Sequence, residues 1–393
     1  MNKNYILYDG AFREALLPFT FTRPVAEIRV GVLTIREKWE KFLGYTTTTL
    51  TEDYLADKYP LIEMEHNVFI NAGYVPNEDF YSKVKHLKEN QVIVFQDEIV
   101  AFFMKEEQEE IDFDEVESIE VEGLLPLDCK WNLYVNNEEA IKRDFELLTK
   151  DAISQPIPKG VTAVNSSEIF IEEGAELNVC VLNAANGPIY IGKNAVVLDG
   201  ALIRGSFALG AGSVVKMGAK IYGATTVGPN CKVGGEIKNS ILFGNSNKGH
   251  EGYLGDSVIG EWCNFGADSN VSNLKNTYST IRLWSYEKQE YENTNQLCCG
   301  LMMGDHSKTS INTMFNTGTV VGVSANIFGI GVPEKLIPSF SWSSQNVVDV
   351  YRLKKALKTA GRMMLLSGEK LSDQDKKILE KVFEITENYR VKY

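Results

Sequence analysis

The sequence lacks several features that would place it in common functional classes. It has only four histidines, its six cysteines are scattered without a CxxC pair, and no run of 18 apolar residues occurs. The cysteines are therefore expected to be reduced core residues, and a histidine-rich metal centre is disfavoured. The N-terminal stretch MNKNYILYDG has no apolar leader segment. These absences predict a cytoplasmic protein that neither spans nor binds a membrane.

Basic residues are also scarce. There are 40 Lys and Arg against 53 Asp and Glu, which gives a net charge of −13. This balance disfavours broad binding to a nucleic acid backbone, although a local basic site is compatible with it. Part of the acidity lies in residues 105–122, which hold ten acidic residues and one lysine. Such a run is typical of a solvated loop or an edge hairpin.

An aliphatic residue recurs at every sixth position in the middle of the chain. Neither an α-helix nor an isolated amphipathic strand has this period. It is the spacing of a left-handed parallel β-helix, in which each flat face of a coil contributes one inward aliphatic side chain. Glycine often follows the aliphatic residue, and small residues occupy the fourth position after it, where the chain turns a tight corner. The run consists of Ile191, Val197, Ile203, Leu209, Val215, Ile221, Val227 and Val233.

Three regions are predicted from these patterns. Residues 1–155 have alternating strand and helix patterns and are predicted to form a divergent α/β nucleotidyltransferase-like domain. Residues 160–342 are predicted to form the β-helix, and residues 343–393 a helical tail that caps it. Two segments, Asn245–Gly252 and Asn273–Gln296, break the six-residue period and are predicted to be loops that leave the β-helix.

Helices and strands are also predicted outside the repeats. The apolar spacing predicts helices over Val30–Leu43, Glu78–Glu89, Glu138–Thr149 and Gln374–Thr386, the last with an N-terminal capping box made by Ser372 and Asp375. Short apolar runs predict strands over Tyr5–Tyr8, Val68–Asn71 and Val92–Phe95.

One stretch of the β-helix carries a distinctive set of polar residues. Lys238 precedes His250 by twelve residues, and Tyr253-Leu254-Gly255-Asp256 and Asn264 follow. This spacing resembles the acetyltransferase half of the bifunctional N-acetylglucosamine-1-phosphate uridyltransferase/glucosamine-1-phosphate acetyltransferase family, and the resemblance covers roughly residues 190–340. A histidine with a pKa near 6.5 is suited to remove a proton from an amine at neutral pH.

The resemblance implies roles for individual residues. His250 would be the general base, and Lys238 and Tyr253 would bind the phosphate of a sugar 1-phosphate. Asn264 and Asn273 would bind the sugar or its amine, and the Ala267 backbone would meet the thioester of acetyl-CoA. Each of these residues also has a structural alternative, such as a loop histidine, a solvated lysine or asparagines in turns.

The N-terminal region resembles a divergent sugar nucleotidyltransferase domain. Such domains hold nucleotide phosphates on a loop after the first strand, with Mg²⁺ offsetting their charge. Arg23 and Arg29 are the candidate phosphate ligands here. The family's glycine-aspartate-valine-proline element appears as Gly73-Tyr74-Val75-Pro76, without a carboxylate, so the metal ligands are unknown.

These observations predict a transferase of amino-sugar metabolism that forms precursors of the cell envelope. Its β-helix would use acetyl-CoA to N-acetylate glucosamine 1-phosphate, and its N-terminal domain would use UTP and Mg²⁺ for uridylyl transfer, giving UDP-N-acetylglucosamine. By resemblance the protein would be a homotrimer. Two alternatives remain at this point: a sugar-1-phosphate nucleotidyltransferase with a purely structural β-helix, and a non-catalytic binding or scaffold relative.

Overall fold

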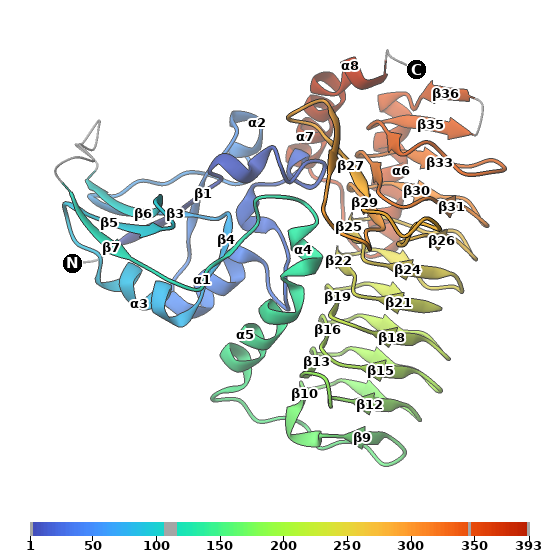
Figure 1. Ribbon diagram of the computed structural model, residues 1–393, viewed down its shortest axis with the longest axis horizontal. Helices are drawn as coiled ribbons and strands as arrows, with labels where there is room; N and C mark the ends of the chain where they lie inside the picture. The colour runs from blue at the N-terminus through green and yellow to red at the C-terminus, as the bar shows by residue number, and fades with distance from the viewer. Residues whose placement is uncertain (1–2, 106–115, 345–346, 391–393) are drawn as a thin grey trace.

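The computed structural model describes residues 3–105, 116–344 and 347–390. Figure 1 shows an N-terminal α/β region beside a tall stack of β-coils, with helices near the C-terminus packed at the upper end of the stack. Most of the acidic run at residues 105–122 lies outside the described residues. No helix in the described part of the chain is long and apolar enough to cross a membrane.

The N-terminal region is built on one mixed six-stranded sheet. Strand β1 pairs in parallel with β2 and β3, and β6 continues the sheet antiparallel to β3 and β5. The core beside this sheet includes Trp39 and Phe80, whose rings lie 5.1 Å apart. In spatial order the strands are β2 (Thr48–Leu50), β1 (Asn4–Tyr8), β3 (His66–Asn71), β6 (Glu98–Lys105), β5 (Gln91–Phe95) and β7 (Glu117–Glu120).

The helices of this region confirm the predicted helices but differ at two ends, and the helix predicted over Glu78–Glu89 ends at His86. Helix α1 begins at Ile35 rather than Val30, because Thr34 and Glu37 form a capping box that fixes the start there. Before it, Gly31 has a φ of 79°, in the left-handed region that ends or precedes a helix. The described helices here are α1 (Ile35–Leu43), α2 (Asp53–Ala56), α3 (Glu78–His86), α4 (Asn132–Val135) and α5 (Asn137–Thr149), and a small sheet pairs β4 (Tyr74–Val75) with β8 (Leu125–Pro126).

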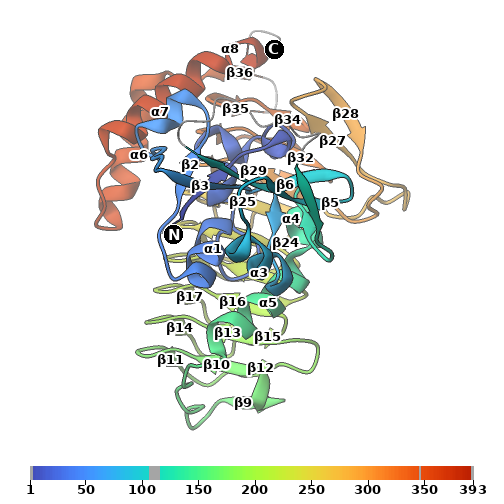
Figure 2. The same ribbon diagram turned by 90° about the vertical axis from the view of Figure 1, so that its left-hand side faces the viewer.

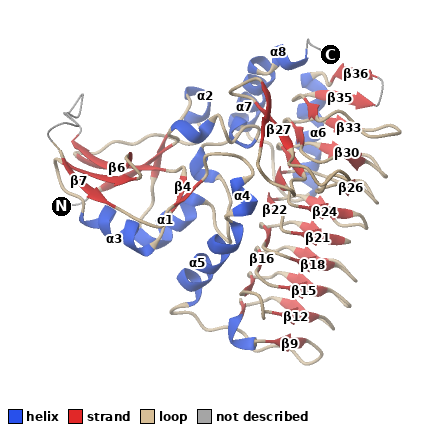
Figure 3. Ribbon diagram, viewed as in Figure 1, coloured by secondary structure: helices blue, strands red, loops and turns tan. Residues whose placement is uncertain are grey.

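The middle of the chain forms the left-handed β-helix, which confirms the prediction from the six-residue period (Figure 3). Each coil contributes strands to three parallel sheets, here called the first, second and third faces. The first face comprises β10 (Ile169–Ile171), β13 (Ile189–Ile191), β16 (Phe207–Leu209), β19 (Thr225–Val227), β22 (Ile241–Gly244), β25 (Val258–Glu261), β29 (Leu301–Met303), β32 (Thr319–Val321) and β34 (Leu336–Ile337).

The second face runs along another side of the same coils. Isolated bridges from Asn247 to Asn264 and from Asn264 to Lys308 join its lower and upper parts into one ladder. Its strands are β11 (Glu176–Leu177), β14 (Val196–Val197), β17 (Val214–Val215), β20 (Lys232–Val233), β23 (Asn247–Lys248), β30 (Lys308–Thr309), β33 (Asn326–Ile327), β35 (Ser341–Ser344) and β36 (Val347–Val350).

The third face carries Lys238 and Tyr253, two of the residues singled out from the sequence. Its strands are β9 (Thr162–Val164), β12 (Val181–Asn183), β15 (Leu202–Arg204), β18 (Lys220–Tyr222), β21 (Glu236–Lys238) and β24 (Tyr253–Gly255), followed by the pair β26 (Asn270–Val271) and β31 (Met314–Phe315).

One predicted interruption of the β-helix is wrong. Residues 245–252 form part of a regular coil, in which β23 pairs with β20 and Lys248 stands opposite Val233. Lys248 occupies the inward position between Leu242 and Leu254 and is only 2% exposed. A search for aliphatic residues passes over this position because a lysine fills it.

The second predicted interruption is confirmed. Residues 273–296 leave the coil and include an antiparallel hairpin of β27 (Arg282–Ser285) and β28 (Glu290–Asn293). The segment then rejoins the β-helix, where Cys299 N–H donates to the Asn273 carbonyl.

The first face of the β-helix is covered by the N-terminal region, as Figures 1 and 2 show from two sides. Helix α5 packs on this face, with Asn137 Nδ2 donating to the Ala224 carbonyl at 2.9 Å. The C-terminal helices α6 (Leu353–Leu366), α7 (Asp373–Ile385) and α8 (Glu387–Arg390) complete the molecule. The Ser372 hydroxyl caps α7 by accepting from Asp375 N–H, as predicted.

Candidate functional site

Three of the candidate residues meet on the third face of the β-helix, around Gly255. Lys238 in β21 stands directly opposite Gly255 in β24. The Tyr253 hydroxyl and the Asn273 amide fill the space above this glycine, since a Cβ atom there would lie 2.4 Å from Tyr253 Oη and 2.9 Å from Asn273 Nδ2. Glycine at position 255 therefore makes room for this group of side chains, a requirement that the sequence alone does not reveal.

Asp256 fixes the orientation of the Asn273 amide. Asn273 Nδ2 donates to one Asp256 oxygen at 2.5 Å and to Tyr253 Oη at 3.1 Å, while Asn239 Nδ2 donates to the other Asp256 oxygen at 2.7 Å. Because a carboxylate only accepts hydrogen bonds, the amide nitrogen of Asn273 must point toward it. The Asn273 oxygen is left as an acceptor for a ligand.

Two hydrogen-bond donors stand beside that acceptor. Burial, together with the nearby Asp256 carboxylate, raises the pKa of Tyr253, so its hydroxyl keeps its proton. The half-buried Lys238 ammonium has no hydrogen-bond or ion-pair partner among the described residues. A cation and a hydroxyl donor next to an amide oxygen suit a phosphorylated sugar.

His250 lies exposed on the turn that leads into β24, and its ring has no hydrogen-bond partner in the described part of the chain. Its backbone is held from inside the β-helix, because Lys248 Nζ donates to the His250 carbonyl at 2.6 Å and to the Gly234 carbonyl at 3.0 Å. Burial lowers the pKa of Lys248 to about 8. Lys248 was not predicted, because it lies off the six-residue count from Val233 and is not aliphatic.

Asn264 lies on another face than Lys238, Tyr253 and Asn273, whereas the turn of Ala267 stacks on the turn of His250, where Asp268 N–H donates to the Glu251 carbonyl. Asn264 belongs to the second face, where its side-chain oxygen accepts from Asn247 Nδ2 at 2.9 Å. Ala267 is on the turn between Asn264 and β26, and its carbonyl accepts from Asn312 N–H. The described residues offer no acceptor to the Ala267 N–H, which leaves this donor available to a bound molecule.

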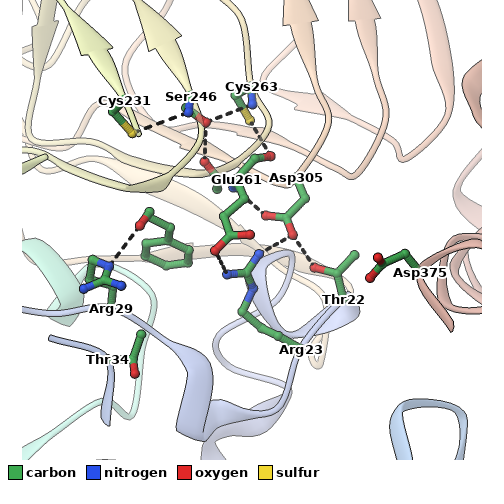
Figure 4. Close-up of polar contacts among 12 residues, drawn as sticks. Thr22, Arg23, Arg29, Thr34, Cys231, Ser246, Glu261, Cys263, Asp305 and Asp375 are labelled. Carbon is green, nitrogen blue, oxygen red and sulfur yellow. Dashed lines mark hydrogen bonds and ion pairs between the residues drawn. The ribbon is translucent and has the colours of Figure 1, made fainter. Parts of the chain in front are cut away.

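The structure places Arg23 between the N-terminal region and the β-helix (Figure 4). Its guanidinium pairs with Glu261 at 3.1 Å and with Asp305, and Thr22 Oγ1 donates to Asp305 at 2.6 Å. The arginine is 5% exposed and also lies over the Phe243 ring, 5.3 Å from its centre. The positive charge of Arg23 is therefore paired with carboxylates inside the protein.

Arg29 is also engaged by the protein itself. Its Nε donates to the Phe243 carbonyl at 2.9 Å, and its Nη1 contacts the Val32 carbonyl and the Glu37 carboxylate. Lys38 on the next helix is buried against Asp144. The structure does not bring Arg23 and Arg29 to the third face of the β-helix, and it gives both of them partners within the chain.

A different part of the N-terminal region is open to solvent. A cavity of about 380 Å³ lies where the parallel strands β1 and β2 end, and its lining includes Asp9, Gly10, Arg13, Glu52 and Asp53. The carboxyl ends of parallel strands are the usual place for ligands in sheets of this type. Sequence analysis did not single out Arg13, Glu52 or Asp53, because nothing in their spacing marks them.

Asp9 and Arg13 hold the loop beside this cavity. Asp9 accepts from Val25 N–H at 2.7 Å, from Arg13 Nη1 at 2.8 Å and from Thr51 Oγ1 at 2.5 Å. Arg13 also donates to the Thr20 carbonyl and the Tyr54 hydroxyl. In the described part of the chain no group of three or more His, Cys, Asp or Glu side chains is placed to hold a metal ion.

The chain is similar to known proteins over both regions. Residues 5–153 match the family described as sugar nucleotidyl transferase. The bifunctional protein GlmU of Synechococcus elongatus is 24% identical over 246 residues, which are 57% of this chain and 49% of that protein. GlmU of Streptococcus equi subsp. zooepidemicus is 30% identical over 174 residues, 38% of each chain. GlmU of Methanocaldococcus jannaschii is 37% identical over 87 residues, 22% of this chain and 21% of that protein.

The matches span about half, or less, of the length of these curated relatives. Among solved structures, the polySia-specific acetyltransferase NeuO is 15% identical and covers 49% of this chain and 81% of its own, with a TM-score of 0.26. The N-terminal region thus matches the sugar nucleotidyl transferase family model, and parts of the chain are similar to GlmU proteins.

Proposed function

We propose that the protein is a sugar-phosphate transferase of amino-sugar synthesis with two sites. The first, on the β-helix, transfers the acetyl group of acetyl-CoA to the amine of glucosamine 1-phosphate. The second, in the N-terminal region, transfers a uridylyl group from UTP to the acetylated product.

The observation that carries the first activity is the convergence of Lys238, Tyr253 and Asn273 over Gly255. Lys238 and the Tyr253 hydroxyl would bind the sugar phosphate, and the oxygen of Asn273 would accept from the sugar or its amine. His250 stands on the turn that enters the same strand, with its ring exposed. This arrangement provides a phosphate site, a sugar ligand and a base from consecutive coils.

The chemistry assigned to these residues is simple acyl transfer. The imidazole of His250 takes a proton from the sugar ammonium or amine, and the nitrogen lone pair attacks the thioester carbonyl. The C–S bond then breaks, an amide forms, and the thiolate leaves and takes up a proton. The free Ala267 N–H is a suitable donor to the negative charge that develops on the carbonyl oxygen.

Ala267 and Asn264 lie on or beside the second face, whereas the sugar-phosphate candidates lie on the third. A homotrimer in which these two faces of neighbouring copies meet would bring all of the candidates to one cleft. The trimer is thus part of the proposal, with acetyl-CoA bound between copies.

The second activity is supported by the family match and by the cavity at the ends of β1 and β2. Arg13 is the cation at that cavity, and Glu52 and Asp53 contribute carboxylates to its lining. Carboxylates of this kind, together with the nucleotide phosphates, would hold Mg²⁺, which would offset the phosphate charge.

A thiol-release assay with glucosamine 1-phosphate and acetyl-CoA tests the first activity. His250→Ala should lower the rate by about two to four orders of magnitude, the usual contribution of general base catalysis. His86→Ala is a matched control, because His86 is an exposed histidine on α3 of the N-terminal region and not on the β-helix. Near-normal turnover in His250→Ala would remove His250 as the base. Pyrophosphate release from UTP and N-acetylglucosamine 1-phosphate tests the second activity, and its absence from the wild type would overturn it.

A further inference from the structure

A basic pocket lies between the β35–β36 hairpin and helix α6. It is a cavity of about 400 Å³, and four cations contribute to its lining: Arg352, Lys355, Lys358 and Arg362. Arg352 immediately precedes α6, and the other three follow on the helix at intervals of three or four residues. This spacing places them along one side of the helix, while Ala356, Ala360 and Met364 on the other side are buried.

The four cations are exposed and are not neutralised by the protein. None of them forms an ion pair or a side-chain hydrogen bond with another described residue, and Asp349 is the one carboxylate in the described lining. The first turn of α6 also lacks an acidic residue. Like charges three or four residues apart on a helix repel one another, so this arrangement has a cost in the absence of an anion.

The neighbouring helix α7 provides a contrast. Three of its exposed lysines each pair with a carboxylate: Lys376 with Asp373, Lys377 with Asp57 and Lys381 with Glu384. In a chain with a net charge of −13, carboxylates are plentiful, and the cations of α6 are nevertheless left without them. The four unpaired cations of this segment therefore all lie at the pocket.

An aromatic side chain forms part of the same pocket. Trp342 in β35 is 40% exposed, and its ring contacts those of Phe328 and Tyr351, whose centres lie 5.1 Å and 4.9 Å away. The Tyr351 hydroxyl is in turn fixed by Thr359 Oγ1 at 2.6 Å. The indole is therefore a supported surface on which a planar ring can stack.

We propose that this pocket binds a phosphorylated nucleotide, with its phosphates on the four cations of α6 and its base against Trp342. Cations that lie beside an exposed aromatic ring match both parts of such a ligand, since a base stacks on the ring while its phosphates contact the cations. Two kinds of ligand contain such a phosphorylated nucleotide: acyl-CoA, at its nucleotide end, and a free nucleoside triphosphate.

The position of the pocket favours acyl-CoA. Trp342 pairs with Asn326, Asn326 with Lys308, and Lys308 with Asn264, so Trp342 is three strands from the coil of Ala267. At about 4.8 Å per strand this separation is about 14 Å along the β-helix. A nucleotide in the pocket could then extend its thioester arm toward Ala267; this choice of source rests on the proposed acetyl transfer, whereas the pocket itself does not.

Calorimetric titration of the full chain with adenosine 3′,5′-bisphosphate and with UTP tests the pocket directly. The double variant Lys355→Ala/Lys358→Ala should weaken binding of the nucleotide that binds by about tenfold to a hundredfold, because two charge-assisted contacts are lost. The matched control is Lys376→Ala/Lys377→Ala, which removes the same charge from paired lysines of α7 and should bind like the wild type. The proposal is overturned if neither nucleotide binds the wild type, or if the α6 double variant binds as tightly as the wild type.

A third variant separates the two parts of the ligand. Trp342→Leu should weaken binding of the nucleotide several-fold and leave the affinity for inorganic pyrophosphate unchanged. Equal weakening of both ligands would mean that Trp342 only supports the local structure, which would overturn the stacking role.

Turnover distinguishes the source of the nucleotide. If the pocket serves acyl-CoA, the α6 double variant should raise the KM for acetyl-CoA and leave kcat/KM unchanged for S-acetylpantetheine, a thioester without the nucleotide. If UTP alone binds and the KM for acetyl-CoA is unchanged, the source is a free nucleotide. Absence of thiol release by the wild type from either donor would refute the proposed acetyl transfer, while the titrations would still decide the pocket.

Discussion

The N-terminal region and the β-helix differ in whether their candidate charged residues are paired within the protein. In the N-terminal region, Arg23 and Arg29 are buried and bonded to partners within the chain. In the β-helix, Lys238 and His250 reach the surface without partners among the residues described. A cation in the sequence therefore has different meanings in the two regions: in one it joins parts of the fold, and in the other it is available to a ligand.

The largest expected effect is a loss of stability when the buried ion pair of Arg23 is removed. Arg23→Ala removes the partner of Asp305, which is 4% exposed and would be left as a buried unpaired charge. Breaking such a pair from one side typically costs about 3–5 kcal/mol in the free energy of unfolding. Urea denaturation measures this loss. A stable Arg23→Ala protein that has lost uridylyl transfer would instead return Arg23 to the role of phosphate ligand predicted from the sequence.

A glycine provides the next test, on the β-helix side. Gly255→Ala should displace Tyr253 Oη and Asn273 Nδ2, which lie 2.4 Å and 2.9 Å from the new Cβ. A displacement of this kind at a substrate-binding group costs about a hundredfold in rate, so acetyl transfer should fall to about that extent. Gly244→Ala is the matched control in the thiol-release assay, because the nearest atom to its Cβ would be 3.5 Å away. Equal rates for the two variants would argue against substrate binding over Gly255.

The β-helix could be predicted from the sequence because its backbone repeats. The run from Ile191 to Val233 fixes the face and direction of the residues within it, whereas the coils that follow are shorter and lose the six-residue count. The count failed at Lys248, which stands opposite Val233 only 15 residues further along the chain and adds no aliphatic side chain to the pattern.

The N-terminal region has no repeat from which positions can be counted. Arg23 contacts residues 238 and 282 positions away, and no local pattern predicts contacts over such a separation. By contrast, the start of α1 depends on Thr34 and Glu37, a signal that is local and present in the sequence. The missed parts of the site are thus those that depend on distant segments meeting.

Lys248 allows a test of a charge that is buried inside the β-helix. Burial lowers its pKa from 10.5 to about 8, so between these values the unfolded chain binds more protons than the folded one. The contribution of Lys248 to stability therefore rises as the pH increases from about 8 to 10.5, and each pKa unit corresponds to about 1.4 kcal/mol. Lys248→Met should lack this rise. The free energy of unfolding of the wild type should therefore increase relative to that of Lys248→Met between pH 8 and 10.5.

Urea midpoints at pH 7.5, 9 and 10.5 measure the difference between wild type and Lys248→Met. Lys232→Met is the control, because Lys232 is exposed in β20, next to Asn247 in the same ladder. A wild-type minus Lys248→Met difference that is the same at all three pH values would show that the lysine does not titrate in this range inside the β-helix.

The smallest effect is expected at an ion pair that also joins the N-terminal region to the rest of the molecule. Lys377 on α7 pairs with Asp57 at 2.7 Å, and both side chains are about two-thirds exposed. Water and salt screen this pair, so Lys377→Ala should leave the urea midpoint unchanged within error. Arg23 joins the N-terminal region to the β-helix and Lys377 joins it to the C-terminal helices, and the difference in burial between the two pairs separates a large expected effect from none. A measurable loss in Lys377→Ala that disappears in high salt would show that exposed pairs also hold the N-terminal region in place.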